Sequence, residues 1–239
     1  MQTNWPGYIL GMIVCGIFLH WIITPARPTI KVVYLVPSDR VPREELPEGA
    51  RRAIETVQRW FFDQLDNAKT FALASPLVDT VQTRHPVSWY ESAASKGDTA
   101  LWEAVTRDGF GPTGGEYYDR RHIWIYFLDV DLPQTRPQES GGVVLLRGEE
   151  ISDLLGVEPG CVAAGTIAHE LGHAFGLDHP SECESHPEAD YSVECESVSY
   201  LGGYYFPKAR FLPPEREKLS RSSALAMIKP EVSAVQCSQ

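Results

Sequence analysis

Three histidines and one glutamate near residue 170 have the types and the spacing of a metal site. His169 and His173 are four residues apart in the stretch HELGHAFGLDH, and His179 follows six residues later. On a helix, residues four apart lie one turn above each other on the same face, so two of the imidazoles can meet one ion. Three neutral imidazoles leave a tetrahedral zinc ion one open position, which is typical of a catalytic rather than a structural site. The pattern H-E-x-x-H-x-x-G-x-x-H therefore predicts zinc bound by His169, His173 and His179.

Glu170 is the candidate acid–base group of this site. It directly follows the first histidine and can reach a water molecule in the open zinc position without being a ligand itself. A carboxylate there can accept the proton of the attacking water and pass it to a leaving amine. We therefore expect Glu170→Ala to retain zinc and to lose turnover.

The surrounding residues predict the helix that carries the motif. Apolar residues recur there at helical spacing, which would bury one face in a core. They are Ala163, Ala164, Ile167, Ala168, Leu171 and Phe175. Gly176 has no Cβ and can take the left-handed conformation that ends a helix, so the chain can turn back and bring His179 to the ion. The alternative is a helix with two exposed histidines followed by an unrelated His–Pro turn. A buried helix with two histidines and a glutamate needs something to satisfy them, which favours zinc.

The stretch HELGHAFGLDH is similar to the zinc signature of the metzincin metallopeptidases. Its short spacing to His179 resembles the matrixin-like and similar bacterial branches. The resemblance implies an α/β (α+β) fold in which a twisted mixed sheet is covered by helices, with a long active-site helix and an irregular C-terminal lower part. It also implies zinc-dependent cleavage of peptide bonds in peptide or protein substrates.

Metzincins also have a methionine in a tight turn beneath the metal, often followed two residues later by tyrosine. The corresponding stretch here, residues 196–200, reads ESVSY. Val198 therefore stands where the methionine is expected. The resemblance gives Tyr200 a role in binding zinc or stabilising the transition state, and a packed aromatic side chain below the site is the alternative.

Residues 141–146 (GGVVLL) predict a short strand after a Pro-rich loop. Its position ahead of the active-site helix resembles the metzincin edge strand, along which an extended peptide is bound by main-chain pairing. This interpretation makes Gly142, Val143 and Val144 candidate substrate-binding residues. The alternative is an edge strand that is simply protected by its loops.

The remaining elements predict one domain. Short apolar or β-branched runs predict strands at residues 30–36, 71–83 and 122–130. Apolar spacing predicts helices at residues 48–66 and from 98 or 99 to 109, a short helical turn at 151–155, and a helix that starts at Pro213. Residues 180–207 read as irregular. This order suits a mixed α/β catalytic domain over residues 27–239.

Residues 1–26 form a separate apolar segment. No charged side chain occurs between Trp5 and Thr24, which predicts a membrane anchor or a signal peptide. The lack of a basic region and of a good cleavage site favours an uncleaved transmembrane helix. We expect a membrane-anchored or secreted protein whose catalytic domain is extracytoplasmic.

Four cysteines lie outside this segment and fit such a compartment. Cys161, Cys183, Cys195 and Cys237 allow three pairings, and the sequence alone does not choose among them. In one pairing, Cys183 and Cys195 close a short loop after the motif, and Cys161 and Cys237 tie the chain end to the start of the active-site helix. Four free buried thiols are the alternative.

Acidic residues dominate the charge of the chain. The net charge is −11 at pH 7 and no block of basic residues occurs, which argues against a nucleic-acid partner. An acidic run after the motif predicts a solvated loop, with a Ca²⁺ site as the alternative. Its members are Glu182, Glu184, Glu188, Asp190, Glu194 and Glu196.

The sequence favours a zinc endopeptidase over two other functions. One is a catalytically silent, zinc-stabilised module that holds a partner peptide, and the other is a zinc-dependent hydrolase of non-peptide amides. Val198 at the methionine position favours the silent module. The intact Glu170 and three histidines argue more strongly for catalysis.

Overall fold

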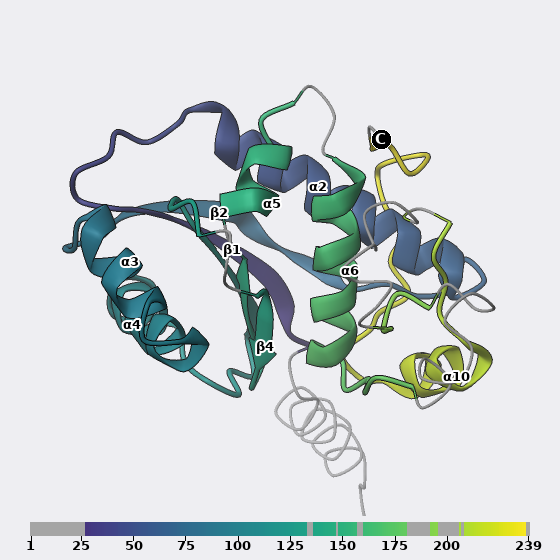
Figure 1. The fold of residues 1–239 in the computed structure, drawn as a ribbon. Coiled ribbons are helices and arrows are strands. Elements are labelled where there is room, and N and C mark those ends of the chain that lie inside the picture. The colour runs from purple at the N-terminus through teal and green to yellow at the C-terminus, as the bar shows by residue number, and fades with distance from the viewer. Residues whose placement is uncertain are drawn as a thin grey trace, which may run out of the picture.

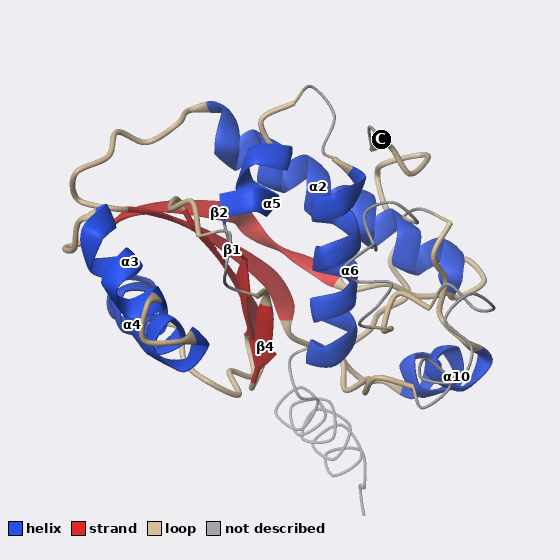
Figure 2. Cartoon of the chain, viewed as in Figure 1, coloured by secondary structure: helices blue, strands red, loops and turns tan. Residues whose placement is uncertain are grey.

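The computed structural model describes residues 27–132, 136–146, 148–156, 160–180, 192–195, 206 and 208–237. These residues build a five-stranded sheet with helices on both of its faces (Figures 1 and 2). The strands are β1 (Thr29–Val36), β2 (Ala72–Gln82), β3 (His122–Leu128), β4 (Gln138–Ser140) and β5 (Val143–Leu146). Their order is β2-β1-β3-β5-β4. All neighbours are parallel except β4, which runs antiparallel to β5. The predicted mixed α/β fold is confirmed.

Two cores lie on opposite faces of this sheet because successive strand residues point to opposite sides. In β1, Ile30 and Val32 belong to one core, whereas Val33 and Leu35 belong to the other. The first core is covered by α2 (Glu45–Gln64) and α6 (Cys161–Ala174), the second by α3 (Val87–Ala94) and α4 (Asp98–Thr113) (Figure 1). The histidine motif is on α6, so the first core is the platform that positions it.

Both ends of α6 are fixed by specific hydrogen bonds. At its start, Asp153 from α5 (Gly148–Asp153) accepts the backbone N–H of Ala163 at 3.0 Å. At its end, Gly176 has a φ of 95°, and its N–H donates to the carbonyl of His173 at 2.8 Å. The N–H of Leu177 donates to the carbonyl of Gly172 at 2.9 Å, which completes a Schellman motif. The predicted role of Gly176 as the residue that turns the chain out of the helix is confirmed.

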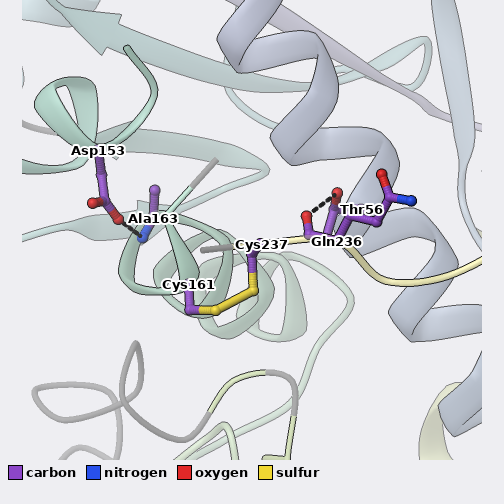
Figure 3. Close-up of a disulfide and its surroundings, with 6 residues drawn as sticks. All are labelled: Thr56, Asp153, Cys161, Ala163, Gln236 and Cys237. Atoms are coloured by element: carbon purple, nitrogen blue, oxygen red, sulfur yellow. Dashed lines mark hydrogen bonds between the residues drawn. A yellow bond between two sulfur atoms is a disulfide. The ribbon is translucent and has the colours of Figure 1, made fainter. Parts of the chain in front are cut away.

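A disulfide ties the C-terminal tail to the start of α6 (Figure 3). Cys161 and Cys237 are bonded across 76 residues of sequence. Next to this bond, the carbonyl of Gln236 accepts a hydrogen bond from Thr56 of α2 at 3.2 Å. One of the pairs considered from the sequence is therefore present, and free thiols are wrong for these two cysteines. Cys195 is also disulfide-bonded, whereas Cys183 lies outside the described residues.

The prediction that residues 141–146 form the edge strand is wrong. Strand β5 lies between β3 and β4, and both Val143 and Val144 pair with residues on each side. The backbone of Gly142 is also occupied, since its N–H donates to Glu139 at 2.8 Å and its carbonyl accepts the N–H of Trp124 at 2.9 Å. These three residues therefore have no main-chain groups to offer a peptide, and the edge belongs to β4.

The helices also differ in part from those that the sequence predicts. We expected a helix to end at Gly109, but α4 continues to Thr113. Gly109 is required for packing, because a Cβ there would lie 2.4 Å from the ring of Tyr126 on β3. Helix α3 was not predicted. The helix predicted to start at Pro213 is present as α10 (Pro213–Arg221).

Some expectations fall on undescribed parts of the chain. Within the described ranges, no helix is both long enough and apolar enough to cross a membrane. The segment for which we predicted an anchor or signal, residues 1–26, lies outside those ranges, as does most of the stretch 180–207.

Candidate metal centre

The structure brings the three histidines of the motif together at the C-terminal end of α6. The Nε2 atoms of His169 and His173 are 3.1 Å apart, those of His173 and His179 are 3.0 Å apart, and those of His169 and His179 are 3.4 Å apart. His169 is buried, His173 is half-buried and His179 is exposed. The three rings therefore converge on one point that is open to solvent on the side of His179.

Two of these rings are oriented by main-chain carbonyls. The Nδ1 of His169 lies 2.7 Å from the carbonyl oxygen of Val193, and the Nδ1 of His173 lies 3.0 Å from that of Leu177. A carbonyl only accepts, so each Nδ1 carries a proton, and Nε2 is the nitrogen that each ring can offer to a metal. Burial, together with the neighbouring His173, lowers the pKa of His169 to about 3. His169 is thus a neutral imidazole, which is the form that binds metals.

This arrangement fits a zinc ion. Zinc–nitrogen bonds of about 2.0–2.1 Å at tetrahedral angles place two ligand nitrogens about 3.3 Å apart. The observed separations of 3.0–3.4 Å lie around that value. Bare lone pairs that face each other at this distance repel, and a shared cation removes the repulsion. Among the described residues, the three histidines are the one group of potential ligands close enough to hold a metal ion.

Glu170 lies beside this cluster and is only 5% exposed. Burial, together with the carboxylates of Glu139 and Glu150, raises its pKa to about 8. A cation among the histidines would oppose this shift because it favours the charged carboxylate. Glu170 therefore has a pKa that a bound metal would tune, as expected of an acid–base group near neutral pH.

Glu194 is a buried carboxylate directly behind the histidines. Its Oε2 lies 3.5 Å from the Nδ1 of His173, and its side chain is fully buried. Burial raises its pKa well above the usual range, and Glu215 and Glu170 raise it further. The sequence predicts a solvated loop for the acidic run, and this is wrong for Glu194.

Glu139 on the edge strand β4 is a second carboxylate that the sequence did not identify. Burial raises its pKa, while the N–H that it accepts from Gly142 and the nearby His173 lower it. Strand β4 is in contact with α6. The edge of the sheet and the histidine cluster are thus adjacent.

Other predicted residues are not described. Val198, Tyr200 and the rest of the acidic run, including the remaining Ca²⁺ candidates, lie outside the described residues.

The sequence did not identify Glu139 and Glu194, for different reasons. Glu139 follows a Pro-rich loop in a strand of only 3 residues, and so short a strand shows no alternation of apolar and polar residues that could predict it. In the sequence, Glu194 cannot be told from its acidic neighbours, and the one hint of its position is Gly172 on α6, which leaves room for its carboxylate.

Comparison with known proteins gives one sequence relative and related structures. No family model matches the chain. Serralysin from Photorhabdus sp. (strain Az29) is 25% identical over 165 residues, which cover 61% of this chain and 33% of serralysin. Wild-type OgpA from Akkermansia muciniphila has a TM-score of 0.55 at 14% identity, over 85% of this chain and 63% of OgpA. Catalytically inactive OgpA in complex with an O-glycopeptide (glycodrosocin) substrate has a TM-score of 0.54 at 14% identity, over 86% of this chain and 63% of OgpA.

These matches agree with the zinc signature. The chain has the fold of OgpA, and its stretch HELGHAFGLDH carries the three-histidine motif on which the resemblance to the metzincins is based. It spans a third of serralysin and less than two thirds of OgpA.

Proposed function

We propose that residues 27–239 form a zinc-dependent endopeptidase domain. His169, His173 and His179 would hold one zinc ion, and Glu170 would be the general base. The observation that carries this proposal is the convergence of three Nε2 atoms at 3.0–3.4 Å, with two rings oriented by carbonyls. The resemblance of the fold to that of OgpA supports it.

The residues of the chain divide the reaction between them. When bound, zinc supplies Lewis acidity, which polarises a carbonyl group and makes water a nucleophile near neutral pH. Glu170 accepts a proton from the attacking water and then donates it to the leaving amine. Tyr200 is the candidate for stabilising the negative charge of the transition state. The carbonyls of Val193 and Leu177 keep the imidazoles of His169 and His173 in the tautomer that presents Nε2.

Strand β4 is the candidate site for the substrate backbone. It is the outermost strand of the sheet, and only one row of its main-chain groups is paired with β5. The other row has no strand beside it within the described ranges, so an extended peptide can add there next to α6. This assignment replaces Gly142, Val143 and Val144 as the proposed substrate-binding residues.

Since a solved OgpA structure contains an O-glycopeptide substrate, we extend the proposed substrate class to peptides with and without O-glycans.

The disulfide between Cys161 and Cys237 supports an extracytoplasmic location. Disulfides form and persist in oxidising compartments, which include the periplasm and the extracellular space. We therefore propose that the catalytic domain works outside the cytoplasm.

The test is metal analysis combined with peptide cleavage. We expect the purified full chain to contain one zinc ion and to cleave members of a library of plain and O-glycosylated peptides, with loss of cleavage in a chelator. Glu170→Ala should keep zinc and lower kcat/KM by about 10²–10⁴-fold. His173→Ala should lose zinc, whereas His85→Ala, on a histidine paired with Asp108, should not.

Two results would overturn the proposal. Cleavage by Glu170→Ala at the parent rate would remove the general base. Stoichiometric zinc without cleavage of any peptide would favour the silent peptide-binding module. For Tyr200, we expect Tyr200→Phe to lower kcat while zinc content is unchanged.

A further inference from the structure

Residues 192–195 cross directly behind the metal-binding helix and contact it at both of its histidines. The carbonyl of Val193 accepts the Nδ1–H of His169, and the carboxylate of the next residue, Glu194, faces the Nδ1 of His173 at 3.5 Å. The segment is held in place by its own contacts. The N–H of Val193 donates to the carbonyl of Arg210 at 3.2 Å, and the N–H of Glu194 donates to the hydroxyl of Ser192 at 3.1 Å.

The carboxylate of Glu194 has no ordinary partner. It is 0% exposed, and within the part of the chain that the structure describes neither of its oxygens has a hydrogen-bond partner. Among the described residues, His173 is the one group within ion-pair distance of it. Two other acids, Glu215 and Glu170, repel its charge and raise its pKa. A buried charge in this position costs free energy unless another charge compensates it.

Helix α6 is shaped to admit this carboxylate. A Cβ on Gly172 would lie 2.0 Å from Oε1 and 2.6 Å from Cδ of Glu194, closer than any side chain could approach. The absence of a side chain at position 172 therefore lets the carboxylate press against the backbone of the helix, one residue before His173. The space that the carboxylate of Glu194 occupies is therefore created by the glycine in α6.

Glu194 is not needed to fix the tautomer of His173. The Nδ1 of His173 already has the carbonyl of Leu177 at 3.0 Å, closer than Glu194 at 3.5 Å. What Glu194 adds is negative charge on the side of the imidazole opposite Nε2. A cation bound at Nε2 makes that imidazole more positive, and carboxylates behind ligating histidines are known to strengthen metal binding.

We propose that Glu194 is an internal counter-charge for the bound metal, which stabilises the metal-loaded site through His173 and destabilises the metal-free protein. Glu194 is thus a positioning residue rather than a catalytic one. The proposal rests on the zinc site of the proposed function but not on its peptidase activity. It predicts effects of opposite sign on metal affinity and on metal-free stability, which a merely structural role would not produce.

The test uses the full chain and zinc alone. Zinc affinity is measured by competition with a chromogenic chelator, and melting temperature is measured in chelator. We expect Glu194→Gln to bind zinc about 10–100-fold more weakly than the parent. We also expect its metal-free melting temperature to rise by about 2–4 °C. The control Glu217→Gln removes an equal charge from an exposed carboxylate on α10 and should match the parent in both measurements.

A second variant removes the polar atoms altogether. Glu194→Met is similar in size and should give the same pair of effects without any new hydrogen bond from an amide. Parent-like zinc affinity in both variants would overturn the proposal. A fall in both affinity and metal-free stability, or failure of both variants to fold, would also overturn it, because Glu194 would then be needed by the fold itself. Failure of the parent to bind zinc would overturn the proposed function as well, so the two failures are distinguishable.

Discussion

Two buried carboxylates in this molecule have opposite surroundings. Asp129, just after β3, is 1% exposed and accepts hydrogen bonds from the hydroxyl of Tyr34 at 2.5 Å, from Arg40 at 3.0 Å and from Arg43. Glu194, behind α6, is equally buried and has no hydrogen-bond partner among the residues that the structure describes. Both are acids in a protein interior, but only one is neutralised by the chain itself.

The difference separates a structural charge from a functional one. The Asp129 cluster contains its own cations and ties the loop after β1 to the end of β3, so it is complete without a ligand. Among the described residues, Glu194 faces the imidazole of His173 and is disfavoured as a charge by two other acids, so on our proposal its charge is compensated only when a cation binds. A buried polar group without a partner is therefore informative about what the site binds.

The largest expected effect is on the Asp129 side of the comparison. Asp129→Asn leaves the guanidinium groups of Arg40 and Arg43 without their carboxylate. Loss of one partner of a fully buried ion pair is strongly destabilising. Because the two arginines are about a third exposed, we expect the free energy of unfolding to fall by less than for a fully buried pair, by about 2–4 kcal/mol. Zinc affinity should be unchanged. Urea unfolding and chelator competition measure the two quantities.

The control for this experiment is Asp79→Asn. Asp79 pairs with Lys31 at 2.9 Å but is 40% exposed, and Lys31 keeps the carbonyl of Pro76 as an acceptor at 2.7 Å, so removal of this carboxylate should cost less than removal of that of Asp129, about 1 kcal/mol. If Asp129→Asn were as stable as this control, or if it stabilised the metal-free protein as Glu194→Gln should, the distinction between the two carboxylates would be lost.

A smaller effect is expected at Gly172, which makes room for Glu194. Gly172→Ala places a Cβ where the carboxylate now lies and should cost about 1–3 kcal/mol by overpacking. In a Glu194→Ala background the same change should cost much less, and the difference measures the coupling between the two residues. Unfolding of the four members of this cycle by urea gives the result.

Gly111→Ala is the matched control, because Gly111 also lies in a helix and a Cβ there would meet nothing within 4 Å. It should be neutral or stabilise the protein by up to about 1 kcal/mol. An equal cost of Gly172→Ala in both backgrounds would show that the clash is not with Glu194.

The last prediction concerns the pH dependence of stability. Burial raises the pKa of Glu170 to about 8 in the metal-free protein, above the value of about 4.3 in an unfolded chain. Between these values the native state retains a proton that the unfolded state has lost, so stability falls as pH rises through this window. We expect the melting temperature of the metal-free protein to fall from about pH 5 to about pH 8, and to fall less steeply in Glu170→Gln. Thermal unfolding in chelator across this range checks it, and a parent-like slope in the variant would contradict it.

Local sequence patterns were sufficient to predict the parts of this protein that depend on neighbouring residues. The motif on α6, the turn at Gly176 and the buried strands follow from spacing and residue type over a few positions. Contacts between distant residues were not predictable in this way. Gly109 looks like the end of a helix until Tyr126 is seen to pack on it, and β4 is an edge only because β5 lies between it and β3.

The same limit applies to the site. His169, His173 and Glu170 are within one turn of helix, so their proximity could be read from the sequence. Glu194 reaches the site from 21 residues beyond His173, within a run of acids that looks like a solvated loop. Nothing local distinguishes it from Glu196 or Glu188.

The most direct test of the central claim is X-ray absorption of the zinc-loaded full chain. If three imidazoles hold the ion, the first shell contains nitrogen or oxygen at about 2.0–2.1 Å, with the outer-shell scattering of imidazole rings. His169→Ala should reduce the number of rings or abolish binding. A first shell of sulfur at about 2.3 Å, or the absence of imidazole scattering, would contradict the account.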